Sequence, residues 1–172
     1  MTTDNRDKMT KPDFLNDEAW EGLKDATGSL ARIRGDAKAD VQRYLDNPDG
    51  WSTGKGSPSG LPTLLLTVIG HKSGEERTTP LVFLQHGESM VVVGSLAGYD
   101  RHPGWYINIS ANPACRVQKD RERLRCVARD ATEAERAALW PKLDAVFPAW
   151  GFFQKQTDRP FPIVILTPVG PA

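Results

Sequence analysis

Three strand-length apolar segments follow one another after Pro62 with only short polar turns between them. They cover Thr63–Ile69, Thr78–Gln85 and Met90–Ser95, and no segment long enough for a crossover helix separates them. Antiparallel strands can be joined by short turns, whereas parallel strands need a crossover of a dozen or more residues. This part of the chain therefore predicts an antiparallel sheet and disfavours a doubly wound parallel fold.

The remaining elements extend this sheet and add helices. Pro103–Ala111 is expected to be a short helix, and a polar turn at residues 119–122 is expected to join two strands, Cys115–Gln118 and Arg123–Ala128. Thr132 and Glu135 form a capping-box pattern at the start of an amphipathic helix. Its expected apolar face holds Leu139, Trp140, Leu143, Val146 and Phe147. With a last strand at Pro162–Thr167, the prediction is a mainly β (α+β) protein, with six strands in a small closed or partly open antiparallel barrel.

The segments before Pro62 are more polar and less periodic. Residues 1–12 are expected to form a disordered tail, and residues 13–62 to form weak N-terminal helices followed by a loop rich in Gly, Pro and Ser. Gly28 and Gly35 are expected to interrupt these helices. Residues 63–172 form the barrel. At 172 residues the whole chain is predicted to be one domain.

Composition excludes several classes of protein. Twenty-two basic residues balance twenty-two acidic ones, so no global field favours nucleic acid or an anionic membrane. No apolar run is long enough to span a bilayer. The three histidines and two cysteines lack metal-ligand spacing, so no metal site is expected. With two cysteines and no secretory signal pattern, a cytoplasmic location is predicted.

The segment from Gly70 to Pro80 gathers groups that bind anions. Between two strands it places cationic and hydroxyl side chains beside glycines, namely Lys72, Ser73, Arg77, Thr78 and Thr79. Such donors, together with accessible backbone N–H groups, suit a phosphate or a carboxylate. The order of residues is not that of a Walker loop. On composition alone, an ordinary solvated hairpin loop is the preferred interpretation.

A second group of residues runs from Ser95 to Asn108. It leaves a strand, passes Gly98 and Arg101, and enters the expected short helix with His102 and Trp105. A planar cofactor needs such a mixture of an apolar wall and a few fixed donors. The alternative is that the aromatic residues belong to the core and His102 caps the helix.

Together these segments resemble the deazaflavin-dependent nitroreductase family. The matching stretches are L-L-L-T-V-I-G-H-K-S-G-E-E-R-T-T-P-L (64–81), V-V-V-G-S-L-A-G (91–98), R-H-P-G-W-Y-I-N-I-S-A-N-P (101–113) and T-D-R-P-F-P-I-V-I-L-T-P (157–168). Members of this family are coenzyme F420-dependent reductases with an FMN-binding type of split β-barrel. The resemblance implies hydride transfer from C5 of the reduced deazaflavin to a small-molecule electron acceptor.

The resemblance also implies roles for individual residues. Lys72, Ser73, Arg77 and Thr79 would hold the phosphate-containing tail, and Lys55 would help with the oligoglutamate extension. The residues expected to border the deazaflavin are Pro80, Ser95, Gly98, His102, Pro103, Trp105 and Asn108. Ser95 is the matched hydroxyl that could donate or orient a proton, and bulk water is the alternative donor.

The expected substrate pocket departs from the family pattern. Family members active on nitroimidazoles carry a tyrosine where this chain has Val82, and further tyrosines where it has Phe147, Trp150 and Phe153. The expected pocket lining is Val82, Phe147, Trp150, Phe152 and Phe153. Without a phenolic proton, this pocket suits flat apolar acceptors such as coumarin- or aflatoxin-type lactones, quinones and, less readily, nitroaromatics. Core packing is the alternative role for Phe147.

Three further possibilities stay open at this level. The chain could bind F420 without turnover, or it could be an FMN-dependent split-barrel oxidoreductase, and it could be a monomer or a homodimer. In addition, a turn about Asp120-Arg121 would place Cys115 directly opposite Cys126. Reduced thiols are expected there in cytosol, and an oxidative link is the alternative.

Overall fold

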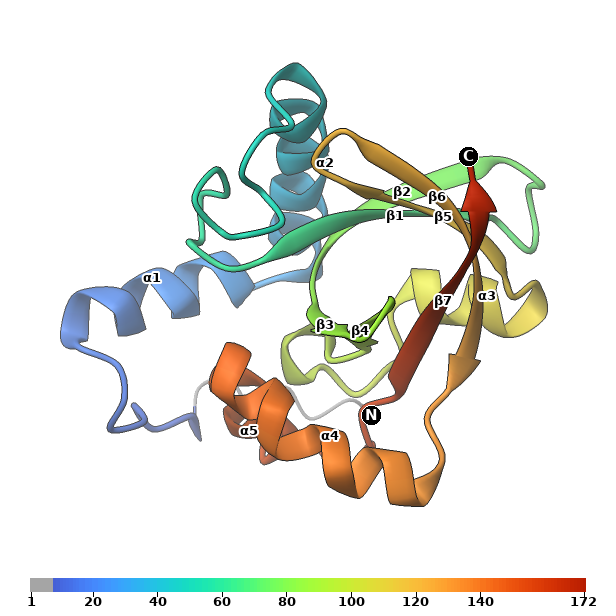
Figure 1. Cartoon of the computed structure of the whole chain (residues 1–172). Helices are drawn as coiled ribbons and strands as arrows, with labels where there is room; N and C mark the ends of the chain where they lie inside the picture. The colour runs from blue at the N-terminus through green and yellow to red at the C-terminus, as the bar shows by residue number, and fades with distance from the viewer. Residues whose placement is uncertain (1–7) are drawn as a thin grey trace.

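The computed structural model describes residues 8–172, and its centre is one strongly curled sheet (Figure 1). Every pair of neighbouring strands is antiparallel, in the order β2-β1-β5-β6-β7-β4-β3. The strands are β1 (Thr63–Ile69), β2 (Glu76–Val82), β3 (Leu84–His86), β4 (Ser89–Val93), β5 (Ala114–Lys119), β6 (Glu122–Asp130) and β7 (Ile163–Pro171). The predicted α+β fold with an antiparallel split barrel is confirmed.

The number of strands differs from the prediction at one place. The segment expected to be one strand, Thr78–Gln85, is divided at Phe83 into β2 and β3. β2 pairs with β1 at one edge of the sheet, while β3 pairs with β4 at the other edge. One straight strand cannot pair at both edges, so the chain bends at Phe83, whose ring is buried and whose N–H donates to the carbonyl of Pro62 (3.1 Å).

The burial of the strands explains their sequence patterns. On β4 and β7 both faces are covered, because alternate residues belong to two different core clusters. Val92 and Val164 face the barrel interior, and Val91 and Ile165 face the helices on the other side. Strands buried on both faces are continuously apolar, whereas β5 and β6 alternate between buried and exposed residues.

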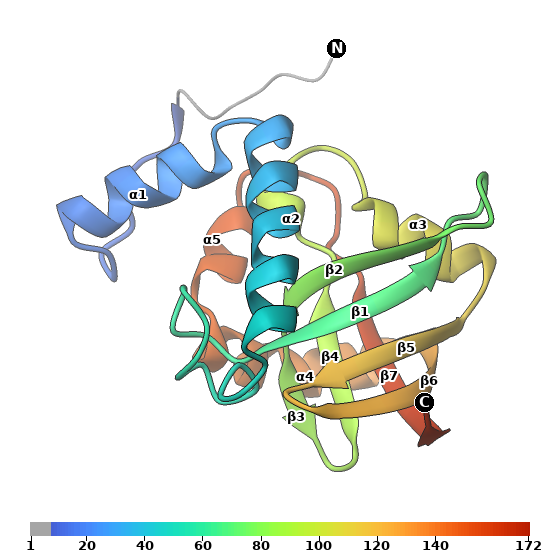
Figure 2. The same ribbon diagram turned by 90° about the horizontal axis from the view of Figure 1, so that it is seen from above.

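The N-terminal segment forms two helices, α1 (Asp17–Thr27) and α2 (Leu30–Asp46). Gly28 caps the first helix as expected, but Gly35 lies inside the second helix and does not interrupt it. Here the packing of α2 outweighs the weak helix propensity of one glycine. Figure 2 shows α2 standing against β1 and β2, where Tyr44, Trp51 and Leu65 form a small separate core.

Three further helices follow the first four strands. They are α3 (Gly104–Ala111), α4 (Glu133–Val146) and α5 (Ala149–Gln154). The capping box of α4 is confirmed, since the side chains of Thr132 and Glu135 accept each other's backbone N–H groups (3.2 and 3.0 Å). The apolar face predicted for α4 packs in the core cluster between the helices and the outer face of the sheet, to which Val91 and Ile165 belong. We call it the outer core cluster. The six-residue helix α5 was not predicted, because its aromatic and glycine content gives no helical periodicity.

The β5–β6 hairpin turns at Asp120-Arg121, as predicted. Cys115 and Cys126 are register partners, both thiols are free and buried, and the Cys115 Sγ lies 3.7 Å from the Cys126 carbonyl oxygen. Burial raises the pKa of Cys115 to about 12 and the pKa of Cys126 to about 11. Since the thiolate is the reactive form, both thiols are poorly suited to oxidation in the folded chain.

Two observations complete the description of the chain outside the barrel. Among residues 8–172, no helix combines the length and the apolar character that crossing a bilayer requires. Of the tail expected at residues 1–12, residues 1–7 lie outside the described residues. Within its described part, Lys11 pairs with Asp17, and the carbonyl of Pro12 accepts the N–H of Leu15 (3.2 Å).

Candidate cofactor site

The β1–β2 loop is ordered by its own backbone. The N–H of Gly70 donates to the carbonyl of Glu75 (2.8 Å), and the N–H of Gly74 donates to the carbonyl of Gly70 (2.8 Å). Gly74 has a φ of +70°, a conformation that favours glycine. Lys72, Ser73 and Arg77 are left exposed on this frame. The loop therefore presents two cations to solvent without using them for folding.

The ion pairs at this loop are weak. The Arg77 guanidinium lies 3.2 Å from the Glu75 carboxylate, and both side chains are more than half exposed. Exposed pairs of this kind contribute about 0–1 kcal/mol. An anionic ligand could therefore compete for Arg77 at little cost.

Helix α3 is attached to the tip of this loop through His71. The Asn108 side-chain oxygen accepts the backbone N–H of His71 (3.0 Å) and lies 2.7 Å from its Nδ1. Because an amide oxygen only accepts, the Nδ1 of His71 carries a proton in this arrangement. Asn108 was expected to border the cofactor, and it is the residue that joins the anion loop to α3. His71 was not among the predicted site residues.

The backbone after β4 adopts an unusual conformation. Leu96, Ala97 and Gly98 have φ values of 41°, 50° and 78°, so three consecutive residues are left-handed. For a residue with a Cβ atom this conformation costs roughly 1–2 kcal/mol. A Cβ on Gly98 would also lie 2.8 Å from the carbonyl oxygen of Phe153 in α5. We call residues 95–99 the left-handed turn.

Arg159 holds the left-handed turn from inside. Its Nη1 donates to the carbonyl of Gly94 (2.9 Å), its Nη2 to the carbonyl of Ser95 (2.8 Å), and both Nε and Nη2 donate to the carbonyl of Tyr99 (3.1 and 3.0 Å). Burial lowers the pKa of Arg159, an effect that nearby Asp100 opposes. Arg159 lies in residues 157–168, one of the stretches that resemble the family, but it was not predicted as a site residue.

His102 lies on the other side of Arg159. Its Nδ1 is 3.3 Å from the Arg159 Nη1, and its ring packs against Tyr106 with centroids 4.9 Å apart. The Tyr106 hydroxyl in turn donates to the Asp130 carboxylate (3.0 Å). Burial and the charge of Arg159 lower the pKa of His102, and Asp130 opposes this effect. His102 is therefore favoured in its neutral form.

Most of the predicted cofactor residues fall into two groups in the structure, and the others lie on α3 or in the loop before β1. Lys72, Ser73, Arg77, Thr79 and Pro80 lie on the β1–β2 hairpin, and Ser95, Gly98, His102 and Pro103 lie around Arg159. Helix α3 connects the two groups, since it begins after Pro103 and bears Asn108. Trp105 on the same helix is 93% buried in the barrel core, with an exposed fraction of 7%. Lys55 lies in the loop that leads into β1, and Lys72 lies in the loop that follows it; Figure 2 shows these two loops at opposite ends of β1.

The aromatic residues predicted to line the substrate pocket are packed in the outer core cluster. Trp150 and Phe153 are buried, while Val82, Phe147 and Phe152 are half-buried. Phe152 packs edge-on against Trp20 of α1 (centroids 5.7 Å apart). Only the half-buried members have faces that a substrate could reach without a rearrangement.

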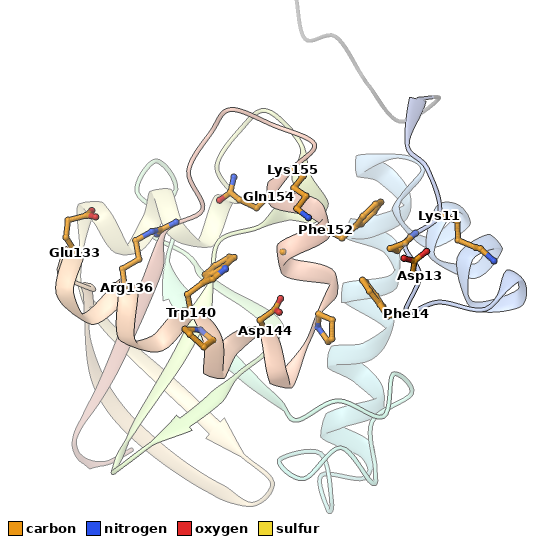
Figure 3. Close-up of a pocket in the computed structure, with 15 residues that line it drawn as sticks. Lys11, Asp13, Phe14, Glu133, Arg136, Trp140, Asp144, Phe152, Gln154 and Lys155 are labelled. Atoms are coloured by element: carbon orange, nitrogen blue, oxygen red, sulfur yellow. The ribbon is translucent and has the colours of Figure 1, made fainter.

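A hollow of about 1080 Å³ opens elsewhere, between the segment before α1 and helices α4 and α5 (Figure 3). Of the predicted pocket residues it contains only Phe152. Its walls mix three cations with three anions, namely Lys11, Arg136, Lys155, Asp13, Glu133 and Asp144. Such a balanced wall gives no selectivity for an anionic cofactor, so we do not assign the cofactor to this hollow.

Comparison with known proteins identifies one family for most of the chain. The family of F420H2-dependent quinone reductases matches residues 38–168. An F420H2-dependent quinone reductase of Mycobacterium tuberculosis (strain H37Rv) is 33% identical over 113 residues, which cover 64% of this chain and 76% of that protein.

Two solved structures are similar to this chain in sequence and in fold. The structure of an F420H2-dependent reductase (FDR-A) has a TM-score of 0.57 at 34% identity, covering 61% of this chain and 93% of that one. A domain-swapped dimer has a TM-score of 0.58 at 30% identity, covering 75% and 95%. Because the family match spans more than half of the chain and includes both loops, this protein belongs to the family of F420H2-dependent quinone reductases.

Proposed function

We propose that this protein transfers a hydride from C5 of reduced coenzyme F420 to quinones and other electron-poor acceptors. The observation that carries the proposal is the pairing of two loops on one helix. The β1–β2 loop offers exposed cations and contacts α3 at Asn108, and the left-handed turn offers a fixed backbone surface that is linked to α3 through Arg159 and His102. The family match supports this choice of cofactor over FMN.

The residues fit the chemistry of the cofactor. F420 carries a phosphate and a glutamate tail, and exposed Lys72 and Arg77 suit such anions because their charges are not consumed by strong ion pairs. Since Lys55 lies toward the other end of β1, it would meet a different part of the ligand from Lys72. The backbone around Ser95 and Pro103 would border the ring, and bound F420H2 would supply the hydride.

The acceptor is proposed to be flat and apolar. Quinones come first, and coumarin- or aflatoxin-type lactones and nitroaromatics extend the range. Phe147 and Phe152 are half-buried and could stack on such a molecule, with buried Trp150 and Phe153 supporting them from behind. No tyrosine hydroxyl is available among these residues, so Ser95 or water would donate the proton.

Two measurements test the proposal. The first titrates the protein with F420 and with FMN and follows cofactor fluorescence; tighter binding of FMN would replace our choice of cofactor. The second follows oxidation of F420H2 with menadione, coumarin and a nitroaromatic compound. Steady turnover with menadione is expected. Tight F420 binding without turnover on any acceptor would instead identify a non-catalytic F420-binding protein.

A further inference from the structure

Arg159 uses all five of its N–H groups, and it uses them on neutral acceptors. Four hydrogen bonds reach the carbonyls of Gly94, Ser95 and Tyr99, and the fifth N–H points at the Nδ1 of His102. A guanidinium has no further donor. Within residues 8–172, no carboxylate forms an ion pair with it. This partly buried cation is therefore committed to holding one loop and one imidazole.

The contact with His102 determines where the imidazole proton lies. The guanidinium cannot accept a hydrogen bond and stays protonated, so the Nδ1 of His102 must be the acceptor. A neutral His102 then carries its single proton on Nε2. Because the two ring nitrogens lie on different edges of the ring, the Nε2–H faces away from Arg159, and the side chain is exposed.

The groups around the ring keep it in this state. Arg159 faces one edge, the Tyr106 ring packs against a face, and Asp130 beyond Tyr106 is engaged by the Tyr106 hydroxyl. Asp100 lies near Arg159 and accepts a hydrogen bond from Thr157 (3.3 Å). None of these carboxylates forms a hydrogen bond with His102 that would stabilise its charged form.

We propose that Arg159 is a positioning residue that fixes His102 as a neutral Nε2–H donor, and that His102 donates this hydrogen bond to the acceptor's carbonyl oxygen. The inference rests on the proposed function. The hydride forms an O–H bond with one quinone oxygen, its two electrons make the ring aromatic, and the electron pair of the other C=O bond moves to its oxygen, which becomes a phenolate. His102 stabilises this phenolate by hydrogen bonding and keeps its own proton. Water then protonates the oxygen and gives the hydroquinone.

The first test needs no cofactor. Long-range ¹H–¹⁵N correlation spectra of the ¹⁵N-labelled full chain report which ring nitrogen of each histidine is protonated. The signals of His102 are identified as those missing from His102→Gln. At about pH 8, where an ordinary histidine is neutral, we expect only the Nε2–H form. A substantial Nδ1–H population in the wild type would overturn the proposal.

Two arginine variants separate the hydrogen bond from the charge. Arg159→Lys keeps the charge but loses the planar fork, so an Nδ1–H population should appear for His102. Arg101→Met removes a charge from the neighbouring exposed position and should leave the tautomer unchanged. If both variants behave like the wild type, Arg159 does not fix the tautomer. If both change it equally, proximity of charge explains the effect and the proposal fails.

The second test measures the donor in catalysis. His102→Phe removes the N–H and should lower kcat with menadione by about 10²-fold, the scale for losing one donor to a developing oxyanion; the assay uses saturating F420H2, so that a change in the Kd for F420 does not enter the comparison. His102→Gln keeps an N–H donor and should recover part of the loss. An unchanged kcat in His102→Phe would overturn the donor role. If the wild type binds no F420, the proposed function and the donor role fail together, while the spectra still decide the role of Arg159.

Discussion

The β1–β2 loop and the left-handed turn are both linked to helix α3, the first by Asn108 and the second through Arg159 and His102, but they are stabilised in opposite ways. The β1–β2 loop closes through its own backbone and leaves Lys72 and Arg77 exposed. The left-handed turn has an unfavourable backbone and depends on a side chain from a distant segment, Arg159. Cations in the first loop are free to bind a ligand, whereas the cation in the second is part of the structure. Substitutions should therefore affect binding in one loop and folding in the other.

Arg159→Met should have the largest effect. It removes the guanidinium donors from the carbonyls of Gly94, Ser95 and Tyr99; the Ser95 carbonyl keeps the N–H of Gly98 (2.9 Å), whereas Gly94 is buried, and a buried unsatisfied group costs about 1–3 kcal/mol. We expect the free energy of unfolding to fall by about 3 kcal/mol in urea denaturation. Arg123→Met, which removes an exposed arginine on β6, is the matched control and should change stability by less than about 0.5 kcal/mol. Equal effects of the two substitutions would contradict the assigned role of Arg159.

Glycine substitutions compare the two loops directly. Gly74 and Gly98 have similar φ values, +70° and +78°, so alanine is strained at both. At Gly74 nothing lies within 4 Å of the new Cβ, but at Gly98 the Phe153 carbonyl oxygen lies at 2.8 Å. Gly74→Ala should cost about 1 kcal/mol from backbone strain alone, and Gly98→Ala about 2–3 kcal/mol. Thermal and urea unfolding measure both, and a reversed order would show that α5 yields easily at this contact.

Arg77→Gln should weaken F420 binding without affecting folding. Loss of one charge-assisted hydrogen bond to an anion is expected to raise Kd about tenfold, which corresponds to about 1.4 kcal/mol. The unfolding free energy should stay within about 0.5 kcal/mol of the wild type, because the Glu75 pair is exposed. Fluorescence titration at two salt concentrations checks this, and the wild-type affinity should depend more strongly on salt.

Arg116→Gln is the matched control for this experiment. Arg116 also pairs with an exposed glutamate of β2, Glu76 (2.8 Å). It lies on β5, which is separated from β2 by β1, rather than at the loop. It should leave the Kd for F420 unchanged. An equal loss of affinity in both variants would mean that general charge, rather than the β1–β2 loop, attracts the cofactor.

The sequence predicted the β1–β2 loop more completely than the left-handed turn. The loop is local, since its glycines, cations and flanking strands lie within about a dozen residues, and turn chemistry applies directly. The contact that fixes the turn joins Gly94 to Arg159, 65 positions along the chain. No periodicity links residues so far apart. The available signal was an arginine between an aromatic segment and a buried strand, where a charge needs partners.

The aromatic residues show a different limit of sequence interpretation. A pocket wall and a core are built from the same side chains, so the sequence alone could not decide between them for Trp150 and Phe153. Their burial follows from the packing of α5 with α4, β4 and β7 in one core cluster. The division of the second strand at Phe83 was missed for a similar reason, because it follows from where the two ends of the strand find partners.

The smallest expected effect is a pH dependence of stability that arises from His102. Its pKa is lowered in the folded chain, by burial first and by Arg159 second, so the unfolded chain binds the proton more tightly. The stability contribution is complete above the unfolded value of about 6.5 and is lost as the pH falls through the window below it. Melting temperatures at about pH 7.5 and pH 5.5, above the carboxylate range, measure this loss.

His102→Gln is the control, because it removes the titration of His102 and leaves every other residue in place. The difference in melting temperature between the two pH values should be smaller in this variant than in the wild type. Arg159→Lys should keep most of the difference, since burial, the larger cause, and the positive charge both persist. If His102→Gln shows the same pH dependence as the wild type, the imidazole is not held neutral by its surroundings. The contrast between the β1–β2 loop and the left-handed turn would then rest on the carbonyl contacts of Arg159 alone.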